Sequence, residues 1–206
     1  MNKTKLLNCE KEFLSTYPDG FESEDMKRIG KKHNIQKHVD YIHKVCSKKH
    51  LKAGLTSYSD VLKVITRSSM VSVFEKMRFR DACNDFDKHE KLEFLDAVYE
   101  IIHGDEKKGF NKLLSIFTPY KLAKWPILTA WKAYYYPHSD VFIKPTTVKK
   151  IIVYLELKDI VYSPKASYGF YKKYRRKMKE MKAVIKTESL KPHNPAFSGF
   201  LMMTIK

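Results

Sequence analysis

Histidine and cysteine side chains are the first candidates for chemistry in this sequence. His38 and His43 are five residues apart, which places them on different faces of a helix. His43 and Cys46 are three residues apart and can lie side by side, but two ligands do not make a zinc site, which takes four. A glycine-rich phosphate loop, a nucleophile elbow and an HExxH motif are absent as well. We therefore expect no catalytic residue, no metal site and no cofactor.

Two carboxylates and a lysine suggest one further chemistry. Asp140, Glu156 and Lys158 match the loose spacing of a signature of Mg²⁺-dependent nucleases, in which carboxylates hold the metal and a lysine supports the attacking water. That chemistry requires Glu156 and Lys158 on a strand, pointing to one side, whereas we predict the end of a helix there. Charged triplets of this form are common in proteins, so a nuclease is the most remote of the alternatives.

Basic side chains offer a different chemistry, the binding of a polyanion. The net charge is +17, with 40 basic and 23 acidic side chains, and residues 101–206 hold 21 of the basic and seven of the acidic ones. Such a one-sided excess is typical of a surface that meets nucleic acid or an anionic membrane. Lysine makes up 34 of the 40 basic residues, and an A+T-rich genome would produce the same bias. The composition therefore indicates where to look for a polyanion and leaves open whether one binds.

The first segment that concentrates this charge is a predicted helix over 146–155. It carries Lys149 and Lys150 and is followed by the β-branched and aromatic run 160–162. A helix followed by an extended segment is typical of a winged helix-turn-helix domain, whose helix enters the major groove while flanking lysines bind phosphates. The turn before this helix is longer than the usual three or four residues, so an ordinary helix of a bundle is the alternative.

The second segment is a predicted helix over 168–186, in which tyrosines and methionines form an apolar seam and basic residues cover the rest. Such a face can follow a phosphate backbone, and Tyr168 and Phe170 at its start could stack on unpaired bases. The alternative is a solvated face over a packed seam. The residues that we predict to bind nucleic acid on the two segments are Lys144, Lys149, Lys150, Lys172, Lys173, Arg175, Arg176, Lys177, Lys179 and Lys182.

The elements that must position these residues are helices, because turn signals divide the chain into helix-length segments with apolar residues at three- and four-residue spacing. We predict helices over 3–16, 24–32, 35–47, from Ser57 or Ser59 through Ile65, from Met70 through Met77, and over 88–103, 107–117, 125–136, 146–155, 168–185 and 194–203. The expected fold is a mostly α-helical, orthogonal multi-helix bundle. A short winged-helix-like β element in the C-terminal third is left open.

Residues 1–206 are expected to form a single α-helical domain, with a sub-boundary near 120–140 and a basic C-terminal half over 140–206. The last predicted helix is uncharged until Lys206. We expect it to be buried against the body of the protein or against a second copy. A protein–protein adaptor or a homo-oligomeric scaffold is therefore the main alternative function.

The cellular compartment is indicated by three features. No apolar run approaches the roughly 20 residues that span a bilayer, and the N-terminus lacks the apolar core of a signal peptide. Cys9, Cys46 and Cys83 are odd in number and form no CxxC pair, which is typical of reduced thiols. We expect a cytoplasmic protein with no membrane partner.

Several segments together resemble a family of uncharacterised bacterial cytoplasmic proteins of about this length. They are residues 13–33, Ser68-Ser69-Met70, Lys124-Trp125-Pro126, residues 144–150 and residues 197–203. The resemblance covers nearly the whole chain and implies a single unit of bacterial or phage origin. It transfers no activity, cofactor or catalytic residue. The leading hypothesis is therefore a non-enzymatic protein that binds DNA or RNA through a basic C-terminal face.

Overall fold

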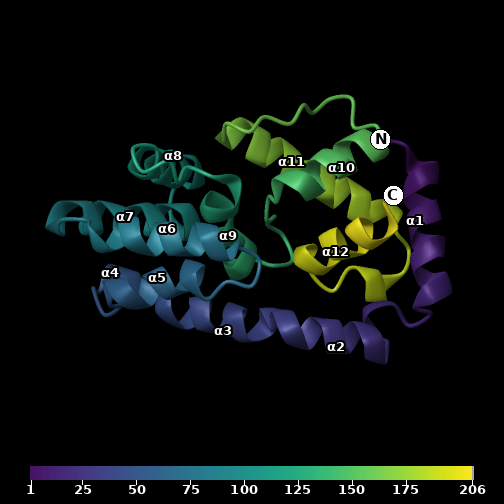
Figure 1. Cartoon of the computed structure of the whole chain (residues 1–206), viewed down its shortest axis with the longest axis horizontal. Helices are drawn as coiled ribbons and strands as arrows, with labels where there is room; N and C mark the ends of the chain where they lie inside the picture. Colours follow the sequence, from purple (N-terminus) through teal and green to yellow (C-terminus); the bar gives the residue numbers. More distant parts are fainter. Residues whose placement is uncertain (206) are drawn as a thin grey trace.

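The computed structural model describes residues 1–205, and all regular structure in these residues is helical (Figure 1). The elements are α1 (Lys3–Thr16), the 3₁₀ turn η1 (Gly20–Glu22), α2 (Glu24–His33), α3 (Ile35–Val45), α4 (Lys48–Lys52), α5 (Tyr58–Thr66), α6 (Val73–Asn84), α7 (Lys88–His103), α8 (Glu106–Phe117), α9 (Trp125–Tyr135), α10 (Pro145–Tyr154), α11 (Tyr168–Val184), the 3₁₀ turn η2 (Glu188–Leu190) and α12 (Asn194–Thr204). The prediction of a mostly α-helical chain is confirmed. None of the described helices combines the length and the apolar composition that a membrane span requires.

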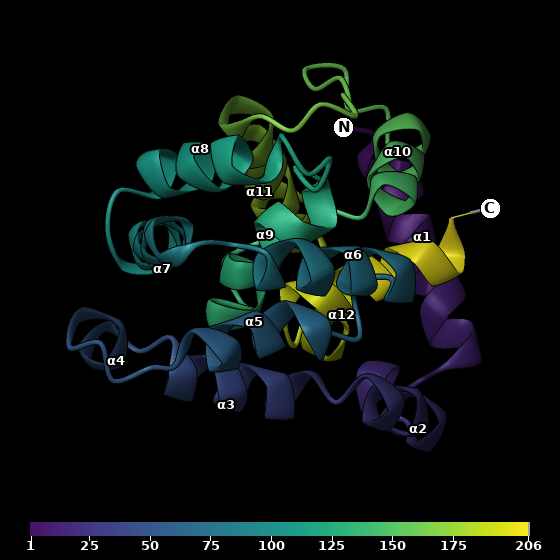
Figure 2. The same ribbon diagram turned by 60° about the vertical axis from the view of Figure 1, so that its left-hand side comes forward.

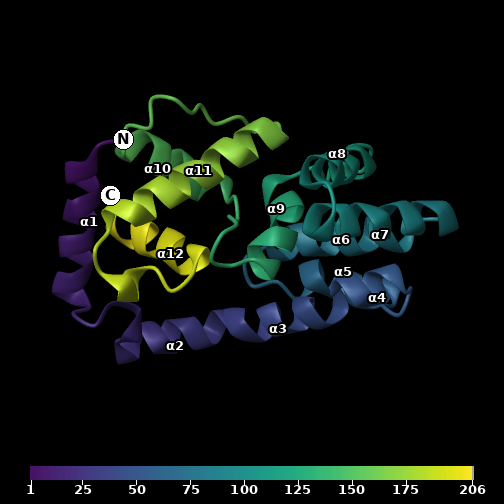
Figure 3. The same ribbon diagram turned by 180° about the vertical axis from the view of Figure 1, so that it is seen from behind.

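The helices gather in two groups that share one core. The first helical group contains α3 to α9, with α7 against α8 and α3 against α5 and α9. The second contains α1, α10, α11 and α12, with α12 packed on both α1 and α10. Helices α2 and α3 follow one another along one side of the molecule and span both groups (Figures 1 and 3). The chain crosses from the first group to the second at residues 136–144, and buried side chains of both groups form one continuous apolar cluster.

Side-chain caps explain where several helices begin. The Oγ atom of Ser57 accepts a hydrogen bond from the amide of Asp60 at 3.1 Å, which confirms the predicted start of α5. Ser72 and Glu75 form a reciprocal capping box, so α6 begins at Val73 rather than at Met70 as predicted. Between α5 and α6, the buried Oγ of Ser68 lies 2.8 Å from the hydroxyl of Tyr134 and accepts hydrogen bonds from the amides of Met70 and Val71.

The apolar seams predicted for the two C-terminal helices are buried. On α11, Tyr171, Tyr174 and Met178 are almost completely enclosed. On α12, Phe200 is fully buried and its ring meets that of Phe13 in α1 edge-on at 5.4 Å. Of the two positions expected for the last helix, the structure therefore shows the first, burial against the body of the protein.

The winged-helix-like β element that the sequence left open is not formed by the described residues. Residues 160–162 form an irregular segment, and the side chain of Val161 is 83% exposed. Helix α10 ends at Tyr154, and Glu156 then adopts a left-handed conformation with φ of 52°. β-Branched residues favour a strand only where a neighbouring strand can pair with them, and no described strand lies beside this segment.

The close packing of α7 on α8 depends on Gly109. A Cβ atom at this position would collide with the backbone of Ile101 in α7. We therefore expect Gly109→Ala to lower the free energy of unfolding by about 1–3 kcal/mol, as overpacked cores do, in urea denaturation followed by circular dichroism. The matched control is Gly169→Ala in α11, where a Cβ atom meets no atom within 4 Å. Equal stability of the two variants would contradict this account of the helix pair.

Candidate nucleic-acid interface

The loop that joins α10 to α11, residues 155–167, is held against α11. Figure 3 shows it arching over α10 and returning to the start of α11. The carboxylate of Asp159 contacts the ammonium group of Lys177 at 2.8 Å. The indole Nε1 of Trp125 donates to the carbonyl of Ser163 at 2.8 Å. These contacts fix the loop, and with it Lys158 and Lys165, to α11 at one point and to α9 at another.

Tyr162 connects this loop to both basic helices. Its ring meets that of Phe170, at the start of α11, at 5.8 Å with the planes nearly perpendicular. The ammonium group of Lys149 in α10 lies 5.0 Å from the centre of the Tyr162 ring, within the range of a cation–π contact. The two segments that the sequence marks as basic are therefore brought together through one aromatic side chain.

Seven lysines around this loop are exposed, and none has an ion-pair partner within residues 1–205. They are Lys149 and Lys150 on α10, Lys158 and Lys165 in the loop, and Lys172, Lys173 and Lys179 on α11. We call this set the basic face. The sequence prediction missed two of its members, Lys158 and Lys165. Their place between the two basic helices was the signal that could have found them.

Of the other five predicted binding residues, four are engaged by partners and Lys144 lies at a different site. Lys177 is buried between the carboxylates of Asp159 and Glu180, at 2.8 Å from each, and Arg176 contacts the same two carboxylates at 3.4 Å. Lys182 donates to the side-chain oxygen of Asn194 at 2.9 Å. Lys144 is the residue before α10 and lines a groove between α2 and α12. The remaining residue, Arg175, belongs to a buried network.

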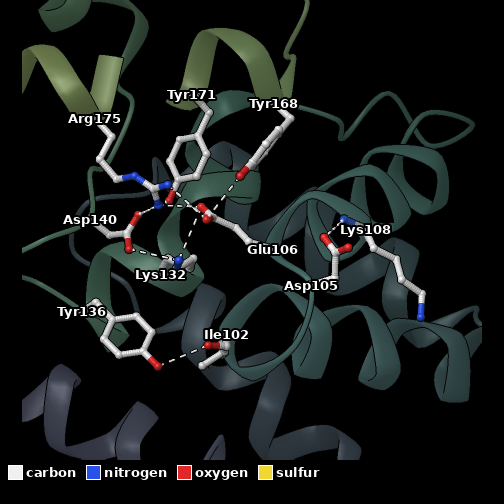
Figure 4. Close-up of polar contacts among 10 residues, drawn as sticks. All are labelled: Ile102, Asp105, Glu106, Lys108, Lys132, Tyr136, Asp140, Tyr168, Tyr171 and Arg175. Atoms are coloured by element: carbon white, nitrogen blue, oxygen red, sulfur yellow. Dashed lines mark hydrogen bonds and ion pairs between the residues drawn. The ribbon is translucent and has the colours of Figure 1, made fainter. Parts of the chain in front are cut away.

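Arg175 is the centre of this network, which joins both helical groups (Figure 4). Its guanidinium binds the carboxylate of Glu106 at the start of α8 through two contacts, at 2.5 and 3.0 Å, and binds Asp140 at 2.7 Å. The ammonium group of Lys132 in α9 contacts the same two carboxylates, at 3.2 Å to Asp140 and 3.4 Å to Glu106. The hydroxyl of Tyr171 donates to Asp140. Two acids and two bases are thus paired with one another.

The network is structural in character, because its charges satisfy one another. Burial alone would lower the pKa of Arg175, but the hydrogen bonds to Glu106 and Asp140 outweigh it and raise that pKa. Burial and the nearby Asp140 raise the pKa of Tyr171, so the phenol stays protonated as a donor. Within residues 1–205, no group of three histidine, cysteine or acidic side chains is placed to hold a metal ion.

The three residues of the nuclease hypothesis are not brought together. Asp140 lies in the buried network, whereas Glu156 is exposed and pairs with Lys5 of α1 at 2.9 Å. Lys158 is exposed in the turn that follows. The nuclease chemistry requires Glu156 and Lys158 on a strand, pointing to one side. In the structure both residues lie in turns that follow the end of α10. The geometry that a metal-dependent nuclease needs is therefore not formed by these side chains.

The side chains considered for metal or base-stacking chemistry also have structural partners. His43 contacts the carbonyl of Tyr135 through Nε2 at 2.7 Å, and burial raises the pKa of Cys46 to about 12. His43 and Cys46 therefore do not act as a pair of metal ligands in this structure. The predicted stacking role of Phe170 is wrong, because its ring is buried and stacks on Tyr174.

Comparison with known proteins adds no template for this arrangement: no family model matches the chain, and neither a curated protein nor a solved structure matches it. The resemblance to uncharacterised bacterial cytoplasmic proteins therefore stays a prediction. Functional conclusions depend on the geometry of the described residues.

The buried network generates a prediction about stability. Replacing Asp140 with alanine leaves Arg175 and Lys132 with one carboxylate and removes the acceptor of the Tyr171 hydroxyl. We expect Asp140→Ala to lower the free energy of unfolding by about 3 kcal/mol or more, as the loss of one partner from a buried ion pair does. Urea denaturation measures this change in the free energy of unfolding. Asp159→Ala, which removes an exposed carboxylate that also pairs with α11, should change stability far less, and the reverse order would contradict the assignment.

His193 makes the stability of the second helical group depend on pH. Its Nδ1 accepts a hydrogen bond from the amide of Ala196 and caps α12, while burial, with the charges of His138 and Lys182, lowers its pKa from 6.5 to about 4. Between these values the unfolded state binds the proton and the folded state does not. The free energy of unfolding is therefore expected to fall as the pH drops through this window.

His193→Asn keeps a capping acceptor without a titratable group. We expect this variant to lose less stability than the wild type between about pH 7 and pH 4, measured by urea denaturation at both values. The control His89→Asn changes an exposed histidine and should keep the wild-type difference. An unchanged pH dependence in His193→Asn would overturn the assignment.

Proposed function

We propose that this protein is a non-enzymatic nucleic-acid-binding protein, which holds the phosphate backbone of DNA or RNA on the basic face of α10, α11 and the loop between them. The observation that carries the proposal is that these lysines are exposed and without a carboxylate partner within the described chain. The acidic side chains of this half are already engaged. They are Asp105, Glu106, Asp140, Glu156, Asp159, Glu180 and Glu188.

The spacing of the lysines on α11 suits a polyanion. Lys172 and Lys179 are seven residues apart on one continuous helix, which is about 10 Å along the helix axis. Duplex DNA presents about six negative charges over that length. Several lysines at this spacing can displace condensed counterions together, and that release is the main source of non-specific affinity.

The kind of side chain on the basic face indicates how sequence would be read. Arginine is the usual bidentate partner of guanine, but Arg175 is partly buried and paired with Glu106 and Asp140, and Arg176 contacts Asp159 and Glu180. Lysine contacts phosphate as a point charge. The described residues form no β wing, and the basic face carries only lysines. We therefore expect binding that depends on salt and hardly on base sequence.

A fluorescence-anisotropy titration with labelled duplex and single-stranded oligonucleotides tests the proposal. We expect the wild type to bind both with a Kd below about 10 µM at about 50 mM salt. The triple variant Lys172→Ala, Lys173→Ala, Lys179→Ala should bind at least about tenfold more weakly. The slope of log K against log salt should flatten by about one for each phosphate that the variant no longer neutralises.

The control for this experiment removes the same charge from another surface. Lys37 and Lys44 on α3 and Lys48 on α4 are exposed lysines of the first helical group. The triple alanine variant at these positions should bind nearly as well as the wild type. Absence of binding by the wild type, or equal weakening by the two triple variants, would overturn the proposed interface.

A further inference from the structure

An apolar groove of about 1170 Å³ runs between α2 and α12. Met26 and Ile29 line it from α2, Met202 and Met203 line it from α12, and Met70, just before α6, closes one end. Methionine side chains adapt to the shape of what they contact and are frequent on surfaces that bind apolar helices. Of the elements that carry the basic face, α10 also reaches this groove, through Thr146 and Thr147 in its first turn, but none of the seven lysines of the basic face lines it.

Two glycines keep the groove open. Gly30 lies inside α2 and Gly199 inside α12, both line the groove, and a Cβ atom at either position meets no atom within 4 Å. A glycine in a helix interior costs about 1 kcal/mol relative to alanine. Because neither glycine packs against another part of the described chain, the space that they leave is available to an occupant from outside.

An exposed apolar projection lies close to this groove. On the first turns of α6, Val73 is 70% exposed, Phe74 68% and Met77 50%. They are neighbours on one side of the helix, and Figure 2 shows α6 in front, with no other helix over its outer side. We call these three residues the α6 knob. Clustered apolar side chains of this kind on a surface mark a binding site.

The knob and the groove are neighbours in the fold. Met70 lines the groove and Val73 begins the knob three residues later, a chain length that spans at most about 10 Å. A surface that carries an apolar projection next to an apolar hollow is self-complementary under a two-fold rotation. Two-fold dimers are the commonest symmetric assemblies, and each copy then contributes the same patch.

Charges at the two features are also complementary. At the rim of the groove, Lys31 and Lys144 are exposed without an ion-pair partner in the part of the chain described, as is the carboxylate of Glu22. The knob is flanked by Glu75 and by Arg78, whose guanidinium lies 5.6 Å from the centre of the Phe74 ring. The rim thus carries two unpaired positive charges, and the Glu75 carboxylate, which caps α6, places a negative charge beside the knob that can approach them.

We propose that this chain forms a two-fold dimer in which the α6 knob of each copy enters the groove between α2 and α12 of the other. The same contact is made twice, so Phe74 and Met77 of both copies lose their exposure to water. The dimer does not depend on the proposed nucleic-acid binding, and its test is made in the absence of nucleic acid.

Size-exclusion chromatography with light scattering tests the dimer with three single variants. We expect the wild type to have twice the chain mass of 24.3 kDa. Phe74→Glu, which charges the knob, and Gly199→Trp, which fills the groove, should both give the chain mass while circular dichroism shows wild-type helix content. Leu92→Glu alters another exposed apolar residue, 60% exposed on α7, and should remain dimeric.

Mixing the two monomeric variants distinguishes this contact from other interfaces. A Phe74→Glu chain keeps its groove and a Gly199→Trp chain keeps its knob, so one of the two contacts can re-form between them. Energy transfer between fluorophores on the two variants should exceed the transfer within either variant alone. A monomeric wild type, a dimer that survives both substitutions, or equal energy transfer in all three samples would overturn the proposal.

Discussion

The pairing of Arg175 and Lys132 with Asp140 and Glu106 is the interaction on which the arrangement of the protein depends. It joins the start of α8, the body of α9, the segment 136–144 and the middle of α11 in one buried set of charges. Helix α11 carries three of the seven lysines of the basic face, and its orientation relative to the first helical group is fixed here. A neutral, internally paired network is also screened by salt much less than exposed charges are.

This network and the ion pairs of Asp159 together explain why the lysines of the basic face have no carboxylate partner in the described chain. The few carboxylates of the C-terminal half are used to hold helices and loops in place. Arg175 and Lys177 supply the matching positive charges, and the exposed lysines are what remains. The unpaired lysines of the basic face are therefore a consequence of where the acidic side chains lie as well as of the composition.

Local features of the sequence determined most of the helices, and distant partners determined which charges are free. The bounds of α1 and α7 and the buried seam of Tyr171 and Met178 follow from apolar spacing and turn signals. Local patterns could not show that Arg175 is engaged and therefore not part of the nucleic-acid-binding residues, because its partner Glu106 is 69 residues earlier in the sequence. The wing at 160–162 was predicted from local β propensity, which tertiary context overrides.

The open glycines of α2 and α12 imply a conflict between stability and the proposed dimer. A search for thermostable variants would favour residues with a side chain at Gly30 and Gly199, because a Cβ atom there raises helix propensity and itself meets no atom within 4 Å. The bulkier of these replacements would also fill the hollow between the two helices. Selection for heat resistance and selection for association would therefore act in opposite directions at the same two positions.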